Sequence, residues 1–153
     1  LLKHGIPIDS KFGGILQIRR GETLRFVELI SYAGSSLDPS EIFIRGKMTS
    51  VGQVVREDEG KILANFREIP ALSRSLVDRV VEDFAKCGIS GVLSIGNMGD
   101  TVCQTRVDVN KIGMILIGGL NPVAAVVEEG LEVDNKAMST VMEYGKLRDI
   151  ETL

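Results

Sequence analysis

An internal repeat is the sequence feature that most constrains how this chain folds. The pattern G-[IV]-L-x-I followed by G-[ED]-T-[LV] occurs twice, at Gly14–Leu24 and at Gly91–Val102. A Leu-[Asp/Asn]-Pro triplet follows each copy, at Leu37–Pro39 and at Leu120–Pro122, and each triplet is followed by a cluster of Lys, Met, Ser and Thr. The same order of matches in both copies indicates a duplicated supersecondary unit.

The repeat predicts one domain, residues 1–153, built from two similar halves. The halves cover about 1–51 and 83–141, and 52–82 connects them. We expect an α/β (α+β) fold class, with a mixed sheet, few helices and a pseudo-twofold relation between the halves. A chain of 153 residues with 44% hydrophobic residues is large enough to bury a core without disulfides or metals.

Short apolar runs between turn residues predict the strands. These are Gly14–Ile18, Leu24–Ile30, Ile42–Ile44, Lys61–Ile69, Gly91–Ile95, Val102–Val107 and Ile112–Ile117. Alternation along Lys61–Ile69 places Arg67 on its less apolar face, beside Leu63 and Asn65. Apolar residues at helical spacing predict a helix over Leu72–Phe84, and Arg56–Gly60 is expected to be a solvated turn. Asp38 has the position of a helix-capping residue.

The stretch Ile112–Glu129 predicts a strand, a glycine turn and a helix in succession. Gly118 and Gly119 end the strand, Asn121 is a good capping residue, and the proline that follows suits the first turn of a helix over Val123–Glu129. Free backbone N–H groups and the positive end of the helix dipole make such a corner a ready anion site. A tight corner that packs and binds nothing is the alternative from these residues alone.

Composition argues against several classes of protein. The formal net charge of −3 is unlike that of a nucleic-acid-binding surface, and no apolar run reaches the length of a membrane span. One histidine and two cysteines provide no zinc set, and they fit a reduced, cytoplasmic protein. Adjacent carboxylates such as Glu128 and Glu129 are typical of solvated faces, so we expect no catalytic residues, metal or cofactor. The chain begins at Leu1 without methionine, which we interpret as a piece of a longer protein.

Basic residues beside small hydroxyls are the best candidates for binding. Arg45 and Lys47 precede Thr49, Lys136 precedes Ser139, and Arg67 stands alone on its strand. A cationic side chain followed by hydroxyl donors suits a carboxylate or a phosphate, and arginine can hold a carboxylate with two hydrogen bonds. Solvated surface charges, or a packing motif preserved by duplication, are the alternatives.

Three separated motifs resemble those of one family. The segments Phe66–Pro70, Gly118–Ala125 and Asn135–Thr140 are similar to motifs in the effector-binding domain of NrpR, the archaeal nitrogen repressor. The resemblance spans about Gly14 to Tyr144. It implies a domain that binds 2-oxoglutarate as inducer, forms a homodimer, and contacts operator DNA only through an N-terminal winged helix-turn-helix that is absent from this chain. Association with a membrane is not implied.

We therefore hypothesise a 2-oxoglutarate site with two basic ends. Arg67, Lys136, Ser139 and Asn121, with the backbone of Gly118 and Gly119, form one end; Arg45, Lys47 and Thr49 contribute to the other. The function predicted from this hypothesis is effector sensing and dimerisation for a repressor of nitrogen-assimilation genes. Two alternatives are an enzyme domain acting on a carboxylate or phosphate substrate and a purely structural dimerisation module.

Overall fold

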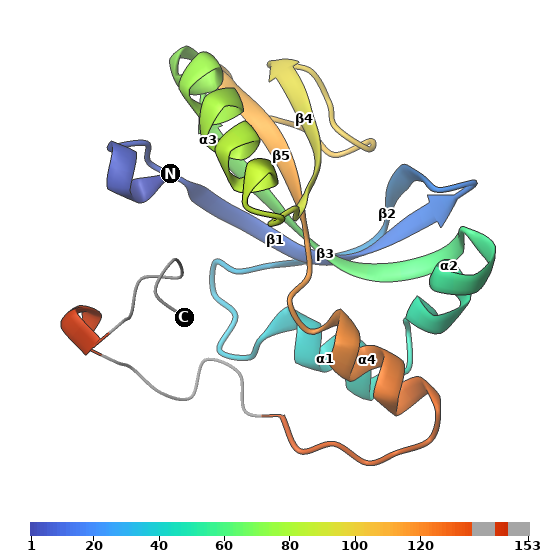
Figure 1. The fold of residues 1–153 in the computed structure, drawn as a ribbon. Helices are drawn as coiled ribbons and strands as arrows, with labels where there is room; N and C mark the ends of the chain where they lie inside the picture. The colour runs from blue at the N-terminus through green and yellow to red at the C-terminus, as the bar shows by residue number, and fades with distance from the viewer. Residues whose placement is uncertain (136–142, 147–153) are drawn as a thin grey trace.

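Five strands form a single sheet in the order β2-β1-β3-β5-β4, and all neighbouring strands are antiparallel (Figure 1). The structure is a computed structural model that describes residues 1–135 and 143–146. The strands are β1 (Asp9–Arg19), β2 (Glu22–Ser31), β3 (Glu59–Pro70), β4 (Val92–Met98) and β5 (Lys111–Ile117). The α-helices are α1 (Pro39–Arg45), α2 (Val51–Glu57), α3 (Arg74–Lys86) and α4 (Asn121–Glu128). Short 3-10 helices occupy Leu2–His4, Ala71–Ser73 and Tyr144–Lys146.

This arrangement confirms the predicted α+β class and several of its elements. The predicted segments Leu24–Ile30, Lys61–Ile69 and Ile112–Ile117 lie within β2, β3 and β5. The helix expected from apolar spacing is α3, and it is followed by Gly88 at φ 75°, a conformation that glycine adopts without strain. These segments were predictable because each has one apolar face whose period matches its own geometry.

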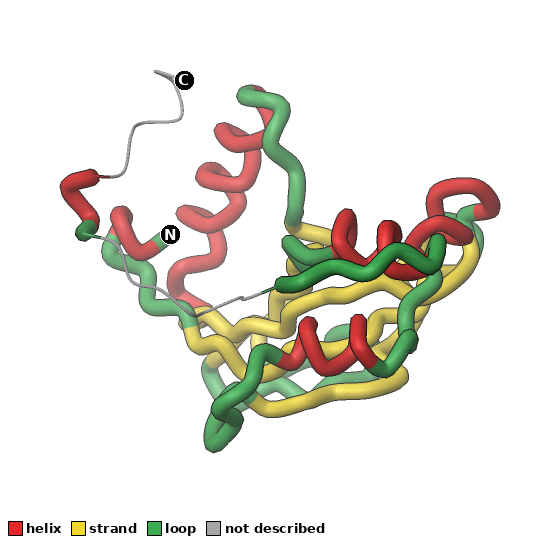
Figure 2. Tube along the Cα trace, turned by 90° about the horizontal axis from the view of Figure 1, so that it is seen from below, coloured by secondary structure: helices red, strands yellow, loops and turns green. Residues whose placement is uncertain are grey.

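One face of the sheet carries two separate apolar clusters beneath helices. Both views show α1 and α4 side by side at one end of the sheet and α3 at the other (Figures 1 and 2). Leu63 of β3 belongs to the cluster beneath α1 and α4, together with Phe43 and Ala124. Ile69 of the same strand belongs to the cluster beneath α3. The stretch of β3 between Leu63 and Ile69 therefore crosses from one helix group to the other.

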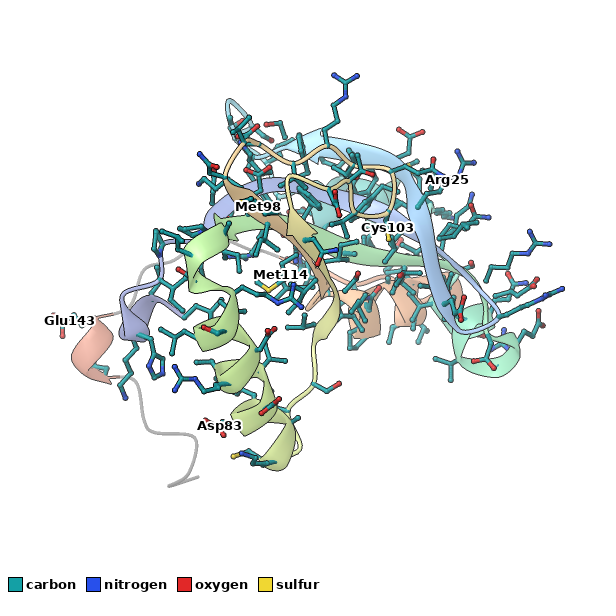
Figure 3. The ribbon with its side chains drawn as sticks, turned by 90° about the horizontal axis from the view of Figure 1, so that it is seen from above. Arg25, Asp83, Met98, Cys103, Met114 and Glu143 are labelled. Carbon is teal, nitrogen blue, oxygen red and sulfur yellow. The ribbon has the colours of Figure 1, made fainter. Side chains whose placement is uncertain are left out.

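The opposite face of the sheet holds an aromatic cluster around the fully buried Phe66. Its ring centroid lies 6.1 Å from that of Phe12 and 6.4 Å from that of Phe26, the latter edge to face. Residues 99–110, which connect β4 to β5, pack on this face through Val102. Figure 3 shows this connection running from Met98 through Cys103 over the sheet. On this face a loop covers the apolar side chains of the sheet, whereas helices cover them on the other face.

Two predicted strands are wrong. Val102–Val107 forms only an isolated bridge between Val102 and Thr105, because Cys103 and Gln104 have φ of 45° and 64° and turn the chain at once. Val102 is nevertheless buried, in space that Gly96 and Gly113 leave by lacking side chains. Its apolar character therefore serves burial beneath the loop and not strand pairing.

The second wrong strand, Ile42–Ile44, lies inside helix α1. The Asp38 side chain accepts a hydrogen bond from the Ser40 N–H at 3.0 Å, as the predicted cap requires, and Pro39 occupies the first turn. Phe43 and Ile44 are then buried together against Ile15. Capping and tertiary burial outweigh the strand preference of this short β-branched run.

The predicted turn Arg56–Gly60 is mostly regular structure. Helix α2 continues to Glu57, Asp58 alone turns at φ 56°, and Glu59 begins β3. The expected exposure of this charged run is confirmed, and only its conformation differs from the predicted turn. Only one residue is needed to reverse the chain.

The two predicted repeat halves occupy unlike places in the sheet. Gly14–Ile18 lies in β1, which has neighbours on both sides, whereas the matching segment contributes to β4 at the sheet edge. Both Leu-[Asp/Asn]-Pro triplets begin helices, α1 and α4, which share one apolar cluster. The repeat is therefore visible in the helical corners and not in the order of the strands.

The described residues offer neither a membrane span nor a metal cluster. No helix within 1–135 and 143–146 has the length and apolar character needed to cross a bilayer. In the same residues no three His, Cys, Asp or Glu side chains gather as metal ligands, and Cys87 and Cys103 are both free thiols.

Candidate anion-binding site

Two polar residues of β3 separate the two apolar clusters on the helical face. Asn65 and Arg67 lie between Leu63 and Ile69 on the strand. Because these four are every second residue of β3, their side chains share one face. The backbone neighbours of Arg67 are Ser10 in β1 and Met114 in β5. This two-residue step, which we call the polar step, places a guanidinium between the helix pair α1/α4 and helix α3.

Arg67 has a buried hydrogen-bond donor without a partner. Its Nε atom is shielded from solvent and makes no hydrogen bond to any residue of 1–135 or 143–146. Buried polar atoms are almost always paired, and an unpaired one costs free energy, so each exception is a candidate for function. An anionic acceptor would satisfy this donor and offset the charge.

The residues around Arg67 in its sequence motif all serve the fold. Phe66 and Ile69 are core residues, and the buried carboxylate of Glu68 accepts a hydrogen bond from the Asp108 N–H at 3.0 Å. Lys11 pairs with Asp108 at 2.7 Å and lies 3.6 Å from Glu68. The hydrogen bond to Asp108 raises the pKa of Lys11. These contacts tie the 99–110 connection to the sheet and leave Arg67 as the member of the motif with an unused donor.

Tyr32 orients the amide of Asn65. The Tyr32 hydroxyl donates to Asn65 Oδ1 at 2.6 Å, and Gly13 makes room for it, since a Cβ there would lie 3.0 Å from the hydroxyl oxygen. Burial raises the pKa of Tyr32 and the Asp38 carboxylate raises it further, while Arg67 lowers it. The phenol therefore keeps its proton at neutral pH. This hydrogen bond holds Oδ1 toward Tyr32 and leaves the N–H groups of Asn65 free to donate to a ligand.

The polar step therefore combines a cation with hydrogen-bond donors. Asn65 and Arg67 are two positions apart, about 6.6 Å along a strand. A ligand suited to it carries a negative charge and adjacent acceptors, and carries no ammonium group. A 2-oxo acid has this chemistry.

Asn121, which we had expected to cap helix α4, serves the fold. The helix begins at Asn121 itself, its cap position is Leu120, and that prediction is therefore wrong. The Asn121 amide donates to the carbonyls of Leu63 and Gly118 at 2.9 and 3.0 Å and accepts from the Leu63 N–H at 2.8 Å. The side chain extends the hydrogen bonding of β3 just beyond the end of β5, and its donors and acceptor are all in use.

The glycine turn is equally committed to packing. The Gly118 N–H donates to the Leu63 carbonyl at 2.8 Å, and a Cβ on Gly118 would collide with Leu63. Gly119 is exposed and has open space around it. Both residues stay predictions as ligand contacts, and the geometry gives Gly118 a structural reason to be glycine.

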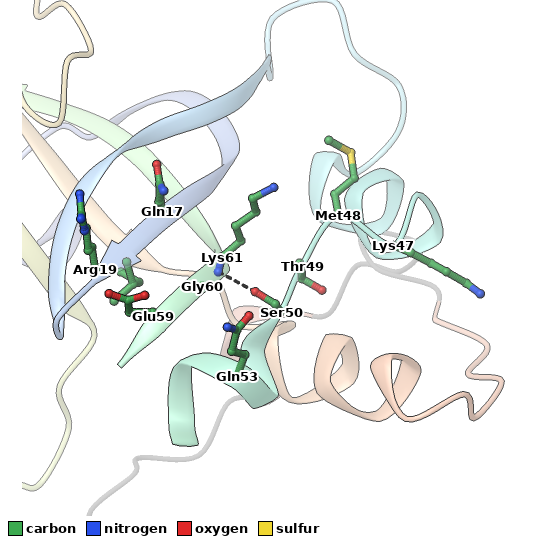
Figure 4. A pocket seen from close by; sticks show the side chains of 11 residues that line it. Gln17, Arg19, Lys47, Met48, Thr49, Ser50, Gln53, Glu59, Gly60 and Lys61 are labelled. Atoms are coloured by element: carbon green, nitrogen blue, oxygen red, sulfur yellow. Dashed lines mark hydrogen bonds between the residues drawn. The ribbon is translucent and has the colours of Figure 1, made fainter. Parts of the chain in front are cut away.

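The residues predicted for the second basic end lie elsewhere. Arg45 is exposed and pairs with Glu41 at 2.9 Å. Lys47 and Thr49 line a cavity of about 570 Å³ that Lys61 also lines (Figure 4). Lys61 and Arg67 are six positions apart on β3, about 20 Å along the strand. A single molecule of 2-oxoglutarate cannot reach both, so the structure does not bring the two predicted ends together.

A helix N-terminus does bind a carboxylate, although not at the predicted corner. Glu128, in the last turn of α4, accepts from the N–H groups of Val51 and Gly52 in α2 at 2.8 and 2.9 Å. Burial raises the pKa of Glu128, but hydrogen bonds from Thr49, Gly52 and Val51 outweigh it, and the net pKa is lowered. Glu128 is exposed, as expected for a solvated face, and it also links α4 to the N-terminus of α2.

Replacing Glu128 with glutamine should weaken the fold in a pH-dependent way. A depressed pKa in the folded chain stabilises it above the unfolded glutamate pKa, about 4.3. That stabilisation is lost as pH falls through the lower folded pKa. We expect Glu128→Gln to reduce the free energy of unfolding by about 1 kcal/mol at pH 7, as for other helix caps. Urea denaturation at pH 7 and at pH 3 should show that the difference in unfolding free energy between the variant and the unchanged protein is smaller at pH 3. Glu129→Gln, a change at an exposed neighbour, should have little effect.

Comparison with known proteins identifies the family. The model of the NrpR regulatory domains NRD1 and 2 matches residues 1–149. The chain is 37% identical to the global nitrogen regulator NrpRI of Methanosarcina mazei over 98% of its length, and 29% identical to the NrpR of Methanocaldococcus jannaschii over 99%. The chain belongs to the NrpR family. A solved nitrogen repressor-like protein from Methanococcus jannaschii has a TM-score of 0.73 and 31% identity over 90% of this NrpR domain.

This NrpR domain corresponds to part of its longer relatives. It covers 46% of the Methanosarcina mazei regulator, 26% of the Methanocaldococcus jannaschii regulator and 56% of the solved chain. The relatives are named as global nitrogen regulators, and the predicted family is confirmed. The activities of those whole proteins come to this domain only as proposals.

Sequence reasoning missed Asn65 of the polar step and its hydrogen-bond partner Tyr32 in this NrpR domain. Asn65 was detectable, because strand alternation already placed it on the face of Arg67. Tyr32 was not, because its place depends on the pairing that brings the Tyr32 N–H to the Lys11 carbonyl at the end of β1. Lys136 and Ser139, also predicted, lie outside the described residues.

Proposed function

We propose that this domain is the effector-sensing and dimerisation domain of a repressor of nitrogen-assimilation genes, and that it binds 2-oxoglutarate as inducer at the polar step. The observation that carries the proposal is the buried, unpartnered Nε of Arg67 between two helix groups. Membership of the NrpR family supports the regulatory role. In this proposal the domain has no catalytic residue and needs no metal or cofactor.

The donor set supports an oxo acid over an amino acid. In our proposal Arg67 binds the carboxylate and the Asn65 N–H groups donate to the neighbouring keto oxygen. Tyr32 keeps Asn65 in this orientation through its 2.6 Å hydrogen bond. Glutamate would instead present an ammonium group to donors and to a guanidinium, which leaves both sides unsatisfied. The site would thus distinguish the nitrogen-free acid from its aminated form.

Signal transmission would follow from the position of the site between helix groups. A ligand at Arg67 lies between the apolar cluster beneath α3 and the cluster beneath α1 and α4. We propose that it favours one relative arrangement of these helices, in which a dimeric repressor does not bind its operator. A tenfold shift of that equilibrium requires only about 1.4 kcal/mol of differential affinity. Operator contact would come from a winged helix-turn-helix elsewhere in the parent protein.

Titration with three related acids tests the site. We expect 2-oxoglutarate to bind saturably and to raise the melting temperature of the domain, since a ligand of the folded state stabilises it. Glutarate, which lacks the keto oxygen, should bind about tenfold more weakly, and glutamate about thirtyfold more weakly, equivalent to roughly 1.4 and 2 kcal/mol. Calorimetry gives the affinities.

The outcomes of that titration separate the two parts of the proposal. Equal affinity for glutamate and 2-oxoglutarate would contradict the donor-only site. No binding of any of the three acids would contradict effector sensing by this domain. Turnover of 2-oxoglutarate, followed by proton NMR of the mixture, would favour an enzyme.

A further inference from the structure

A second basic surface lies about 20 Å along β3 from Arg67. It is a cavity of about 570 Å³ where the end of β1, the segment between α1 and α2, and the start of β3 meet (Figure 4). That volume lies within the range of small-molecule sites. Neither the family comparison nor the function proposed above assigns it a ligand.

Positive charge dominates the lining of this cavity. Arg19 comes from β1, Lys47 from the segment after α1, and Lys61 from β3, while Glu59 is the acidic residue of the lining. None of the three cations forms a salt bridge within the part of the chain that the structure describes. Three cations from three elements, in a chain of net charge −3, make a local field that attracts anions.

Two hydrogen bonds between Ser50 and Lys61 hold the wall of the cavity in place. The Ser50 N–H donates to the Lys61 carbonyl and the Lys61 N–H donates to Ser50 Oγ, both at 2.9 Å. Gly60 has φ 148°, and a Cβ there would lie 2.6 Å from Ser50 Oγ, so only glycine permits this crossing. The segment that bears Lys47 is therefore fixed against the strand that bears Lys61 before any ligand arrives.

Neutral donors complete the lining. The Ser50 hydroxyl accepts from Lys61 and retains its own proton to donate. Gln17 accepts from Arg25 at 3.4 Å through its carbonyl oxygen, which leaves its N–H groups available. The N-terminus of α2 is already bound by Glu128, so an anion in the cavity would be held by side chains.

We propose that this cavity binds the phosphate group of a small organic phosphate. Lysine ammonium groups are point charges that approach a tetrahedral dianion from several directions, and a hydroxyl and an amide add directed hydrogen bonds. Lys61 and Arg19 contact the phosphate, and Ser50 and Gln17 donate to it. The Lys47 side chain extends away from Lys61 (Figure 4) and contributes only to the positive field. The site is separate from the polar step and would give the domain a second signal.

Amide chemical shifts of the labelled domain, titrated with inorganic phosphate and then pyrophosphate, test this inference. We expect saturable shifts centred on Ser50 and Lys61 at about 0.15 M salt, where the Debye length is about 8 Å and diffuse attraction is screened. Lys61→Gln should weaken phosphate binding about tenfold, or roughly 1.4 kcal/mol. Lys3→Gln, a change at another exposed lysine, is the matched control and should bind as the unchanged protein does.

Three results would overturn the inference. One is the absence of saturable shifts at Ser50 and Lys61, and another is equal weakening by Lys61→Gln and Lys3→Gln. The third is displacement of phosphate by 2-oxoglutarate with shifts at the same amides, which would make the cavity the oxo-acid site. Shifts near Arg67 on adding 2-oxoglutarate report on the function proposed above, so the two proposals can fail independently.

Discussion

Replacing Arg67 with methionine should lower the affinity for 2-oxoglutarate about a hundredfold, or roughly 2.7 kcal/mol. The change removes the guanidinium while keeping a long side chain between the helix groups. The free energy of unfolding without ligand should not fall, because the unpaired buried Nε disappears with the charge. Calorimetry with 2-oxoglutarate and urea denaturation of the ligand-free protein measure the two effects.

Arg45→Met is the matched control for that experiment. It makes the same chemical change at an exposed arginine that pairs with Glu41 in α1. A surface pair of this kind contributes little, so both stability and affinity should stay close to those of the unchanged protein. If Arg67→Met lost stability and kept its affinity for 2-oxoglutarate, Arg67 would be a structural residue. The proposed site would then be refuted.

Replacing Asn121 with alanine should have the largest effect on the fold, a loss of about 3 kcal/mol. The side chain is 6% exposed and makes three hydrogen bonds to backbone atoms of Leu63 and Gly118. Each such bond contributes about 1 kcal/mol, and its removal leaves the buried Leu63 N–H without an acceptor. Urea denaturation should show a lower midpoint with an unchanged slope.

The control for Asn121 is Asn97→Ala. Asn97 is exposed, and among the described residues its side chain hydrogen bonds only to the exposed Asp100, at 3.3 Å. Its loss should therefore cost less than about 0.5 kcal/mol. If the two variants were equally stable, the structural role of Asn121 would be refuted. If Asn121→Ala kept its stability and lost 2-oxoglutarate binding, the result would support the ligand contact that the sequence predicted for Asn121.

Local pattern was enough to predict much of the sheet and the face of Arg67. Alternation in β3 reports its burial directly, because side chains of a strand point to opposite faces in turn. The helical spacing of α3 carries the same kind of information. Within the motif Phe66–Pro70, alternation therefore separated Phe66 from Arg67 before any contact was known, but it gave no sign that Glu68 is buried.

Local pattern gave the wrong secondary structure where apolar residues are buried in a loop or a helix and not in the expected strand. Val102 is apolar because a loop covers the sheet there, and Ile42–Ile44 is apolar because α1 packs on β1 and β3. Both segments have the composition of a strand. Their conformation was decided by left-handed residues in the loop and by the Asp38 cap in the helix.

The sequence by itself determined the family, the order of most elements and the position of Arg67 on a mixed face of its strand, because periodicity and motifs are local properties. Only the tertiary structure decided which polar groups remain unpaired. The Asn121 side chain bonds to the Leu63 backbone because the pairing of β3 with β5 ends at Ala64 and Ile117, one residue short of Leu63. Arg67 keeps a free donor because its strand crosses between two helix groups. Lys47 and Arg67 belong to different surfaces because Lys47 shares a cavity with Lys61, which lies six positions from Arg67 on β3, about 20 Å along the strand. The order of residues in the chain does not reveal this separation.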